Sequence, residues 1–505
     1  MSFLGVDVGT TGVKAVAFGA DGAQIASAYE EYPLLFPFRG AAELDSARVI
    51  AAARRVIASA SAQAASDPVR SIGIASQGEA FTPLAADGSV LGNGMVSSDT
   101  RAADLVPAFS EAFGAERLYG ITGHTPYPMY SLYKLLWLRD HQPDVWRTMS
   151  RILFMQDLVA HALTGEAATD PSMAARSMLY DVTAGEWSPE VLDALGLEAD
   201  RLPRIVASGT PCGGVTPEAA SELGLAAGIP VSCCGHDQPV GAVGCGASRP
   251  GVAAFSIGTV ECICPALDRL ILDPQLMRSN LASYPHVVGG LWTTVLFSIT
   301  AGSVLRWLRD QVAVSEAAQA AADGVDAYSR IMEAASPEPS RLVVLPHFGP
   351  TGTPHFDPDG AGAVFGLKLS TTRAELFRGF LEGISYEMKW NLDTLGGAGL
   401  NVTELRAVGG GARSPIWMQI KSDILGVPLS TMRVSESTCL GAARLAGVGA
   451  GLLDLEAAEA WAVVGRTFEP DPNRTALYEE RFAIYRDLYQ SMGGARKALR
   501  TMKGD

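Results

Sequence analysis

The sequence predicts an α/β protein built from two lobes of one duplicated fold. Short apolar runs rich in Val and Ile alternate with segments of helical periodicity along the chain, which is the pattern of an α/β fold. The plan of 3–18, an apolar strand, a Gly-Thr turn and a second strand, returns at 251–265, about 250 residues later. We therefore expect a first lobe over 1–247 and a second lobe over 248–505, each bringing a Gly-Thr turn to a cleft between them.

The first lobe opens with two strands joined by the tight turn Gly9-Thr10-Thr11-Gly12, and a further hairpin follows. A helix over 46–64 comes next, with Ser46 or Asp45 as its cap. The β-branched run at 69–76 predicts a strand that delivers polar side chains at its carboxyl end.

Later elements follow the same alternation. In the first lobe we expect a helix over 130–141 with a wide leucine face, and a strand that passes through Gly235 into a helix beginning around Pro239. The second lobe is expected to contain the hairpin at 251–265, a helix over 371–394 capped by Ser370 or Thr371, a strand at 405–408, a helix over 415–425, a strand at 427–430 and a helix over 436–447 that completes the lobe.

The composition excludes several classes of protein. Lys and Arg number 39 against 54 Asp and Glu, and the resulting charge of −15 disfavours nucleic acid, whose sequence-independent binding needs a basic surface. No apolar run reaches the roughly 18 residues that cross a membrane, and the opening residues lack the pattern of a signal peptide. The seven Cys show no paired metal spacing. We therefore expect a cytoplasmic protein that binds neither nucleic acid nor a membrane.

The turn at 9–12 suits a phosphate group. Its glycines let the backbone approach an anion, its hydroxyls and consecutive N–H groups surround one, and Lys14 adds positive charge. Asp7, at the end of the preceding strand, is suited to hold a hydrated Mg²⁺ through water, because magnesium keeps most of its waters. The alternative is an ordinary hairpin turn with a solvated lysine. The spacing matches neither a P-loop nor a dinucleotide-binding G-x-G-x-x-G.

Two further turns offer related chemistry. Ser256-Ile257-Gly258-Thr259 provides a second phosphate turn on the second lobe, with a plain hairpin turn as the alternative. Gly409-Gly410-Gly411 stands between a strand and a helix, where backbone without side chains can pass close to adenine or ribose. A plain strand-to-helix turn needs one glycine, so three in a row favour a ligand.

The segment 235–238, Gly-His-Asp-Gln, ends a strand and starts a helix. We expect the Asp237 carboxylate to stay ionised, because a helix N-terminus stabilises negative charge, and to accept a hydrogen bond from a substrate hydroxyl. The alternative is an aspartate that only caps the helix. For His236 we favour a structural role.

Together these motifs resemble the FGGY carbohydrate kinases, members of the actin/hexokinase/Hsp70-like ATPase superfamily, over nearly the whole chain. The segment 7–14 is similar to the family's opening D-x-G-T-[TS]-x-x-[KR] pattern, and 129–141 looks like its first signature, with the Lys and Trp in place. Residues 379–384 fit the second signature, but the acidic positions after them fit poorly. The resemblance implies two lobes of ribonuclease H-like (actin-like ATPase) fold around a cleft, with ATP as phosphate donor and Mg²⁺ as cofactor.

The resemblance also implies roles for single residues. The segment 235–238 resembles the one that carries the family's catalytic aspartate, so Asp237 is the expected general base. The helix at 301–310 looks like the one whose glycine and following polar residue line the ATP site. The expected ATP-binding residues are Thr10, Thr11, Lys14, Gly258, Thr259, Gly302, Arg306, Gly410, Gly411, Ala412 and Ser414, and the expected metal residue is Asp7.

Departures from the family concern the acceptor. Glycerol kinases carry Gln-Arg-Glu and xylulose kinases Gln-Met-His where this chain has Gln-Gly-Glu at 77–79, and Ser97 replaces the tryptophan of a Trp-x-Asp-x-Arg motif. We therefore expect a wider or more polar pocket. The expected substrate-binding residues are Gln77, Gly78, Glu79, Asp99, Asp237 and Gln238, whose acceptors and amides suit the hydroxyls of an open-chain sugar.

The expected reaction is ATP-dependent phosphorylation of a primary hydroxyl on a small sugar or polyol, with a ketopentose such as xylulose as the first choice. One alternative is a kinase for erythritol, a pentitol, glycerol or gluconate, and for gluconate Arg101 is the obvious cation to face a carboxylate. Another is an actin-like ATPase that acts as a binding module without phosphorylating a sugar. The expected partner is a small molecule, and a homodimer is left as an alternative to a monomer.

Overall fold

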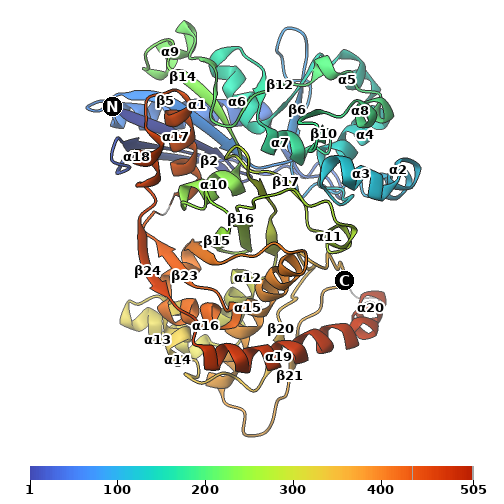
Figure 1. The fold of residues 1–505 in the computed structure, drawn as a ribbon, viewed down its shortest axis with the longest axis vertical. Helices are drawn as coiled ribbons and strands as arrows, with labels where there is room; N and C mark the ends of the chain where they lie inside the picture. The colour runs from blue at the N-terminus through green and yellow to red at the C-terminus, as the bar shows by residue number, and fades with distance from the viewer. Residues whose placement is uncertain (435, 503–505) are drawn as a thin grey trace.

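The computed structural model describes residues 1–434 and 436–502, which form two lobes, each around a mixed six-stranded sheet (Figure 1). The first sheet lies in the upper half of the figure and has the spatial order β13-β14-β5-β1-β2-β3. Its strands are β13 (Pro211–Gly214), β14 (Pro230–His236), β5 (Val69–Ser76), β1 (Ser2–Val8), β2 (Gly12–Gly19) and β3 (Gln24–Glu31).

The second sheet repeats the first strand for strand. In both sheets three antiparallel strands lead to two parallel pairings, and the far edge strand is antiparallel again. In spatial order its strands are β19 (Leu296–Ser298), β16 (Glu261–Pro265), β15 (Val252–Ile257), β22 (Glu404–Val408), β23 (Leu429–Met432) and β24 (Val464–Phe468). The duplication predicted from two hairpins is therefore confirmed over whole sheets.

The register of the first sheet gathers the ends of its parallel strands. β1 and β2 form a hairpin with Val8 opposite Val13, so the turn at 9–12 stands at the end of the sheet. β5 runs parallel to β1 with Ser76 beside Val8, and β14 runs parallel to β5 with His236 beside Ser76. In open α/β sheets ligands bind outside the carboxyl ends of parallel strands, which is where these residues meet.

Helices cover both faces of the first sheet. In β1, Leu4 and Val6 point into a core shared with α1 and α6, while Phe3 lies on the opposite face against Cys439 of α17. The covering helices are α1 (Ser46–Gln63), α6 (Met155–Thr164) and α9 (Pro217–Leu223), and on the other face α17 (Ser437–Gly449) with α18 (Leu455–Glu459).

The position of α17 corrects one expectation. The helix expected to complete the second lobe packs instead on β1 and β5 of the first sheet (Figure 1). The approach is close, because a Cβ at Gly5 would lie 1.8 Å from the Cys439 carbonyl oxygen and one at Gly73 would lie 2.1 Å from that of Ala442. Apolar periodicity shows that a helix buries a face, but it does not show which sheet receives that face.

The helix α10 (Asp237–Gly244) makes the reciprocal crossing. Its Ala242 packs with Val252 and Ala254 of the second sheet, and the helix also packs against α17. At this helix pair a Cβ at Gly441 would lie 1.9 Å from the Val240 carbonyl oxygen. The two lobes are therefore joined by a closely packed pair of exchanged helices.

An outer group of helices and short strands extends the first lobe. It contains β4 (Glu43–Leu44), β6 (Phe81–Leu84), β7 (Gly94–Met95), α2 (Leu105–Phe113), α3 (Ala115–Thr122), α4 (Ser131–His141), α5 (Pro143–Thr148), β8 (Arg151–Phe154), β9 (Ala168–Thr169), α7 (Pro171–Arg176), β10 (Tyr180–Asp181), β11 (Glu186–Trp187), α8 (Pro189–Leu195), the 3₁₀ turn Ala199–Arg201 and β12 (Arg204–Ile205). Much of this group shares a core of its own, separate from the core under the sheet.

The remaining elements belong to the second lobe. They are α11 (Pro274–Arg278), β17 (Tyr284–Pro285), β18 (Trp292–Thr293), α12 (Gly302–Gln311), α13 (Val314–Asp323), α14 (Ala327–Ala334), β20 (Val343–Leu345), β21 (Ala363–Phe365), α15 (Arg373–Gly397), the 3₁₀ turn Gly410–Arg413, α16 (Pro415–Leu425), α19 (Pro472–Ser491) and α20 (Gly493–Thr501). Within residues 1–434 and 436–502, no helix is long and apolar enough to cross a membrane.

Helix caps follow local chemistry. The Asp45 carboxylate accepts from the Arg48 amide at the start of α1, as expected. The expected caps of α15 are wrong by one or two residues, since Thr372 caps this helix and forms a reciprocal capping box with Glu375.

Candidate active site

Asp237 stands where β14 passes directly into α10. The helix begins at Asp237 rather than around Pro239, and the sharp junction depends on Gly235, whose φ is 125°. A Cβ at Gly235 would lie 2.5 Å from both the Ser172 hydroxyl and the Val287 side chain, so only glycine fits. The junction therefore fixes where the Asp237 carboxylate points.

Asp237 lines a cavity of about 240 Å³ between the lobes. From the first lobe the lining residues are Thr10, Gln77, Gly78, Glu79, Ser97, Met129, Tyr130, Arg176, His236, Asp237 and Gln238. From the second lobe they are Cys262, Asn280, Ala282, Val295, Phe297 and Phe356. Five of the six expected substrate-binding residues thus meet in one cavity, which we call the acceptor cavity.

The ionisation of Asp237 differs from the expectation. Burial raises the pKa of Asp237 to about 8, and the negative charges of Asp7 and Glu79 add to the shift. This direction runs against the expected ionised state, because loss of solvation and the two negative charges outweigh the hydrogen bonds with Gln238. A carboxyl with a pKa near the working pH is suited to accept and release protons.

His236 is held as a neutral ring beside Asp237. Its Nδ1 lies 3.1 Å from the Tyr284 hydroxyl and its Nε2 lies 3.3 Å from Asp237 Oδ1. Burial, with the charge of Arg176 nearby, lowers the pKa of His236 well below its ordinary value. The pair is therefore no ion pair at neutral pH.

Glu79 and Arg176 form a buried ion pair in the wall of the acceptor cavity. Glu79 has a φ of 63°. This backbone conformation is unfavourable in free energy for a residue with a side chain, and it often occurs at functional sites. The guanidinium of Arg176 also lies 5.1 Å from the centre of the Tyr130 ring. This arginine, on α7, is the main cavity residue that the sequence motifs missed.

Gly78 lies against two polar side chains of the cavity wall. A Cβ at this position would lie 3.1 Å from the His236 ring and 3.3 Å from Arg176 Nε. Two polar side chains from other elements thus occupy the space that a side chain at 78 would need. A side chain at 78 would therefore contact His236 and Arg176.

Lys134 supports the acceptor cavity from behind. Its fully buried ammonium donates to the carbonyl oxygens of Val96, Met95 and Glu79 at 2.7, 3.2 and 3.4 Å. Burial lowers the pKa of Lys134 to about 8. One side chain from α4 therefore ties two cavity loops together, which gives the Lys of the first signature a positioning role.

Asp99 and Arg101 are engaged elsewhere. The Asp99 carboxylate accepts from the Ala42 amide at 2.7 Å and pairs with Arg101, which also pairs with Glu43 at 2.6 Å. Among the described residues that line the acceptor cavity, neither Asp99 nor Arg101 is found. Arg101 is thus not placed to face a substrate carboxylate, and among the described lining residues Arg176 is the cation.

The turn at 9–12 lies at the edge of the same cavity. The Thr10 hydroxyl donates to Gln77 Oε1 at 2.9 Å, and Gly9 closes the turn with a hydrogen bond to the Gly12 carbonyl oxygen. Lys14 pairs with Glu436 at 2.9 Å. Within the described residues, Thr11 and Lys14 line neither this cavity nor the nucleotide cavity described below.

Asp7 fits the role of a magnesium residue. Its Oδ1 is buried and makes no hydrogen bond within the described part of the chain. Burial raises the pKa of Asp7 to about 6, with Glu436 adding to the shift and Lys14 opposing it. A buried carboxylate oxygen without a partner suits a cation or its bound water, because an unpartnered buried polar atom is costly. No cluster of three or more metal-ligating side chains occurs in 1–434 and 436–502.

A second cavity, of about 450 Å³, lies in the second lobe and is called the nucleotide cavity below. It brings together seven expected ATP-binding residues, which are Gly258, Thr259, Gly302, Arg306, Gly410, Gly411 and Ser414. It also contains seven residues outside the expectation, which are Leu305, Asp326, Tyr328, Ser329, Met332, Arg413 and Trp417. Ala412 lines the neighbouring cavity instead, and Thr10 lines the acceptor cavity.

Glycines shape the nucleotide cavity. The Gly302 amide donates to the Gly258 carbonyl oxygen at 3.1 Å, and a Cβ at Gly302 would lie 2.3 Å from that oxygen. Gly409 has a φ of 95°, and a Cβ there would lie 2.6 Å from the Ile257 carbonyl oxygen. The three-glycine turn and the second phosphate turn therefore pack backbone against backbone.

Comparison with known proteins agrees with this geometry. Residues 2–244 match the N-terminal domain of the FGGY family of carbohydrate kinases, and residues 253–450 match its C-terminal domain. The chain is similar to an autoinducer-2 kinase from Klebsiella pneumoniae, with 32% identity over 98% of this chain and 95% of that protein. It is also similar to the xylulose kinase of Escherichia coli strain K12, with 30% identity over 97% of this chain and 99% of that protein.

Solved structures show the same fold. The crystal structure of xylulose kinase from Rhodospirillum rubrum matches with a TM-score of 0.90 and 27% identity, over 98% of this chain and all of that one. The structure of a xylulose kinase from Brucella ovis matches with a TM-score of 0.88 and 28% identity over 98% of this chain.

Proposed function

The chain belongs to the FGGY family of carbohydrate kinases, whose members are ATP-dependent phosphotransferases, and from this premise we propose that it phosphorylates a primary hydroxyl of a small, neutral, open-chain sugar. The first choice of acceptor is a ketopentose such as xylulose. The observation that carries the proposal is that Asp237 and Thr10 line one cavity. A molecule bound in this cavity would therefore contact both a proton acceptor and a phosphate turn.

Size and charge of the acceptor cavity support a small neutral acceptor. Its volume of about 240 Å³ is below the roughly 300–1,000 Å³ of cavities for drug-sized ligands. Its cation, Arg176, is already neutralised by Glu79. A carboxylate or phosphate in this cavity would find Arg176 already paired with Glu79, so gluconate and phosphorylated sugars fit less well than a neutral sugar.

In the proposed mechanism Asp237 orients the acceptor hydroxyl and takes its proton. Phosphoryl transfer passes through a loose transition state in which the protein mainly positions the reactants, so the proton moves late. Glu79, Gln77 and Gln238 accept and donate hydrogen bonds to the other hydroxyls. Asp99 acts indirectly in this proposal, by holding Arg101 and the loop before it.

We propose that ATP lies in the nucleotide cavity and reaches toward the two phosphate turns. Adenosine lies against the three-glycine turn, where backbone can approach a flat group, and Gly258 and Thr259 donate to phosphate oxygens. Thr10, Thr11 and Lys14 are proposed to complete the phosphate contacts from the first lobe. Since Lys14 is paired with Glu436, it must exchange this partner for phosphate.

Asp7 is the residue that we propose to hold Mg²⁺, through the unpartnered Oδ1. A bound magnesium ion supplies neutralisation of phosphate charge. Closure of the two lobes around both substrates excludes water, and this protects ATP from hydrolysis.

A second acceptor, autoinducer-2, is favoured by one observation. The Klebsiella pneumoniae relative is named for that substrate, and it is as similar to this chain as the named xylulose kinase. Polyols such as erythritol, pentitols and glycerol offer the same primary hydroxyl and stay as further alternatives.

A panel of acceptors tests the proposal. ADP release is measured with saturating ATP and Mg²⁺ over ketopentoses, pentitols, erythritol, glycerol, gluconate and autoinducer-2, with Asp237→Asn as the matched control. We expect acceptor-dependent release with at least one neutral acceptor, and a ³¹P triplet in the product, because a phosphorus on a primary oxygen couples to two protons. ADP release that is not increased by any acceptor would instead support an actin-like ATPase.

A further inference from the structure

Phe356, in the second lobe, forms part of the wall of the acceptor cavity. Its ring lies 4.7 Å from that of Tyr127, in the first lobe, and 5.6 Å from that of Phe297. Its φ is 48°, a conformation that a residue with a side chain holds only when its surroundings impose it. The contacts of the neighbouring residues therefore hold Phe356 in this conformation.

The segment around Phe356 is held by Asp357. The Asp357 amide donates to the Thr351 hydroxyl at 2.8 Å, and the Thr351 amide donates back to the Asp357 carbonyl oxygen at 2.9 Å. The Asp357 carboxylate also takes part, because its Oδ1 accepts a hydrogen bond from the Asp359 amide at 2.9 Å. The segment thus forms a closed loop with one carboxylate as its anchor.

The other oxygen of that anchor is held by the C-terminal helices. Asp357 Oδ2 accepts from the Tyr489 hydroxyl of α19 and from Arg496 Nε of α20, both at 3.1 Å. The Arg496 guanidinium lies 4.0 Å from the centre of the Tyr489 ring and donates to the Tyr489 carbonyl oxygen. Burial works to raise the pKa of Asp357, but these hydrogen bonds and the charge of Arg496 outweigh it and hold the pKa below its ordinary value.

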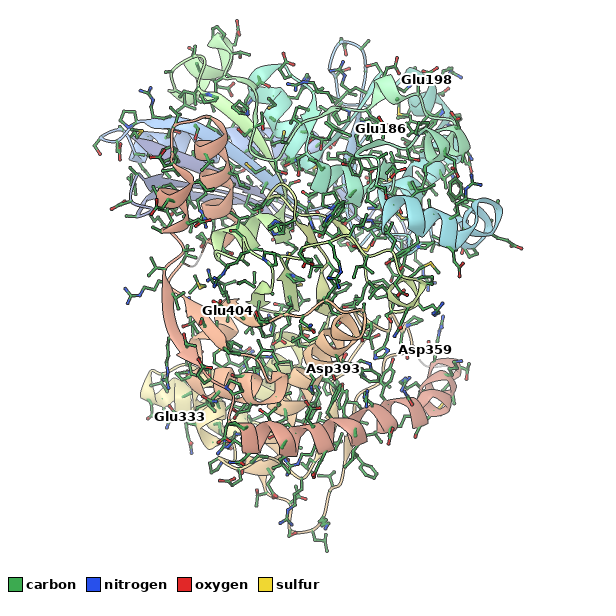
Figure 2. The ribbon with its side chains drawn as sticks, viewed as in Figure 1. Glu186, Glu198, Glu333, Asp359, Asp393 and Glu404 are labelled. Atoms are coloured by element: carbon green, nitrogen blue, oxygen red, sulfur yellow. The ribbon has the colours of Figure 1, made fainter. Side chains whose placement is uncertain are left out.

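A neighbouring ion pair provides a natural control. Arg500 of α20 pairs with Asp359 at 2.8 Å, and Figure 2 shows Asp359 beside this helix. The Arg500 side chain is 66% exposed, whereas that of Arg496 is 7% exposed. The carboxylates differ less, with Asp357 20% and Asp359 10% exposed. A charge on an exposed side chain contributes little, whereas loss of the buried Arg496 leaves its partner without a compensating charge. The two arginines therefore separate the effect of the buried anchor from that of a charge on α20.

We propose that α20, through Arg496, positions Phe356 as a wall of the acceptor cavity and so sets the affinity for the acceptor. Arg496 is a positioning residue in this account, acting through Asp357 on the residue next to it. The proposal rests on the proposed function, because it assumes that the sugar binds in this cavity. It assigns a role in acceptor specificity to a helix that follows both family domains along the chain.

Steady-state kinetics test the link to the cavity. Arg496→Met keeps the stem that packs on Tyr489 and removes the donors to Asp357, and Arg500→Met is the control. We expect the acceptor KM of Arg496→Met to rise about tenfold, the lower end of what loss of apolar contact in a pocket costs. The KM for ATP and kcat should change less than about twofold, as should every constant of Arg500→Met.

A double-variant comparison locates the effect. Phe356→Ala removes the aromatic wall itself. If Arg496 acts only through Phe356, the double variant should have the same acceptor KM as Phe356→Ala alone. Arg496→Lys, which keeps the charge and one donor, should lie between wild type and Arg496→Met. Additive effects of the two substitutions would overturn the proposal.

Hydrogen exchange tests the anchor without any acceptor. The Phe356 amide donates to the Gly352 carbonyl oxygen at 2.9 Å, so peptides covering 351–359 report the loop directly. We expect faster exchange there in Arg496→Met and unchanged exchange in Arg500→Met. Unchanged exchange in Arg496→Met overturns the anchor, and faster exchange with an unchanged acceptor KM overturns its link to specificity. If wild type phosphorylates no acceptor, the proposed function fails, while exchange still judges the anchor.

Discussion

The pH dependence of acceptor phosphorylation follows from the ionisation of Asp237. The base must be ionised to take a proton, and its pKa in the free protein is raised to about 8. Activity is therefore lost as pH falls through about 8. From the titration curve, half of the protein carries an ionised Asp237 at pH 8 and about 1% at pH 6, so kcat/KM for the acceptor should fall about 50-fold between these values.

Two assays check this reasoning. The first is kcat/KM for the acceptor from pH 5.5 to 9 with saturating ATP, since this constant reports the ionisations of the enzyme before the acceptor binds. The second is the pH dependence of thermal unfolding. Asp237 in the unfolded chain ionises near pH 4, so between pH 4 and 8 the folded chain holds one more proton on this residue than the unfolded chain does. The free energy of unfolding should therefore fall by about 1.4 kcal/mol for each unit that the pH rises. Asp237→Asn should remove that part of the slope. A flat kcat/KM between pH 6 and 8, with equal slopes for both proteins, would refute the raised pKa.

Three further predictions concern residues that position the site. Lys134→Met should lower the unfolding free energy by about 3 kcal/mol, because three buried carbonyl oxygens lose their donor, and a melting temperature within a degree of wild type would contradict this. Arg176→Met should lower kcat/KM for the acceptor at least about 100-fold in steady-state assays, because Glu79 is left buried without its cation; a loss below threefold would be inconsistent. Gly409→Ala should raise the KM for ATP about tenfold and leave the acceptor KM unchanged, because its Cβ would lie 2.6 Å from the Ile257 carbonyl oxygen and displace the turn; equal changes in both constants would exclude this account.

Much of the fold could be predicted because its signals are local. The β1–β2 hairpin, β5 and the helix capped by Asp45 follow from alternation, turn residues and capping, which act over a few residues. The duplication was visible because both copies keep a Gly-Thr turn. The exchanged positions of α10 and α17 could not be predicted, because the sheet on which such a helix packs depends on glycines such as Gly5 and Gly73 that lie far away in sequence.

The candidate site divides in the same way. Motif residues such as Asp237 and Gly258 could be found because turns and strand ends carry recognisable patterns. Arg176 and Phe356 could not, because no motif marks them and only tertiary packing brings them to the acceptor cavity. The pKa of Asp237 also depends on packing, since burial and the charges of distant residues set it. The lobe boundary at 247–248, a homodimer and the cellular location stay predictions.

The central claim, that Asp237 is the base for transfer to a sugar hydroxyl, is tested most directly by acceptor-dependent ADP release of Asp237→Asn. Loss of a general base costs about 10²- to 10⁴-fold, so release should fall by that factor. Binding of ATP should stay within about twofold of wild type, because Asp237 lies in the acceptor cavity and not among the described residues of the nucleotide cavity. Wild-type turnover by this variant would contradict the account.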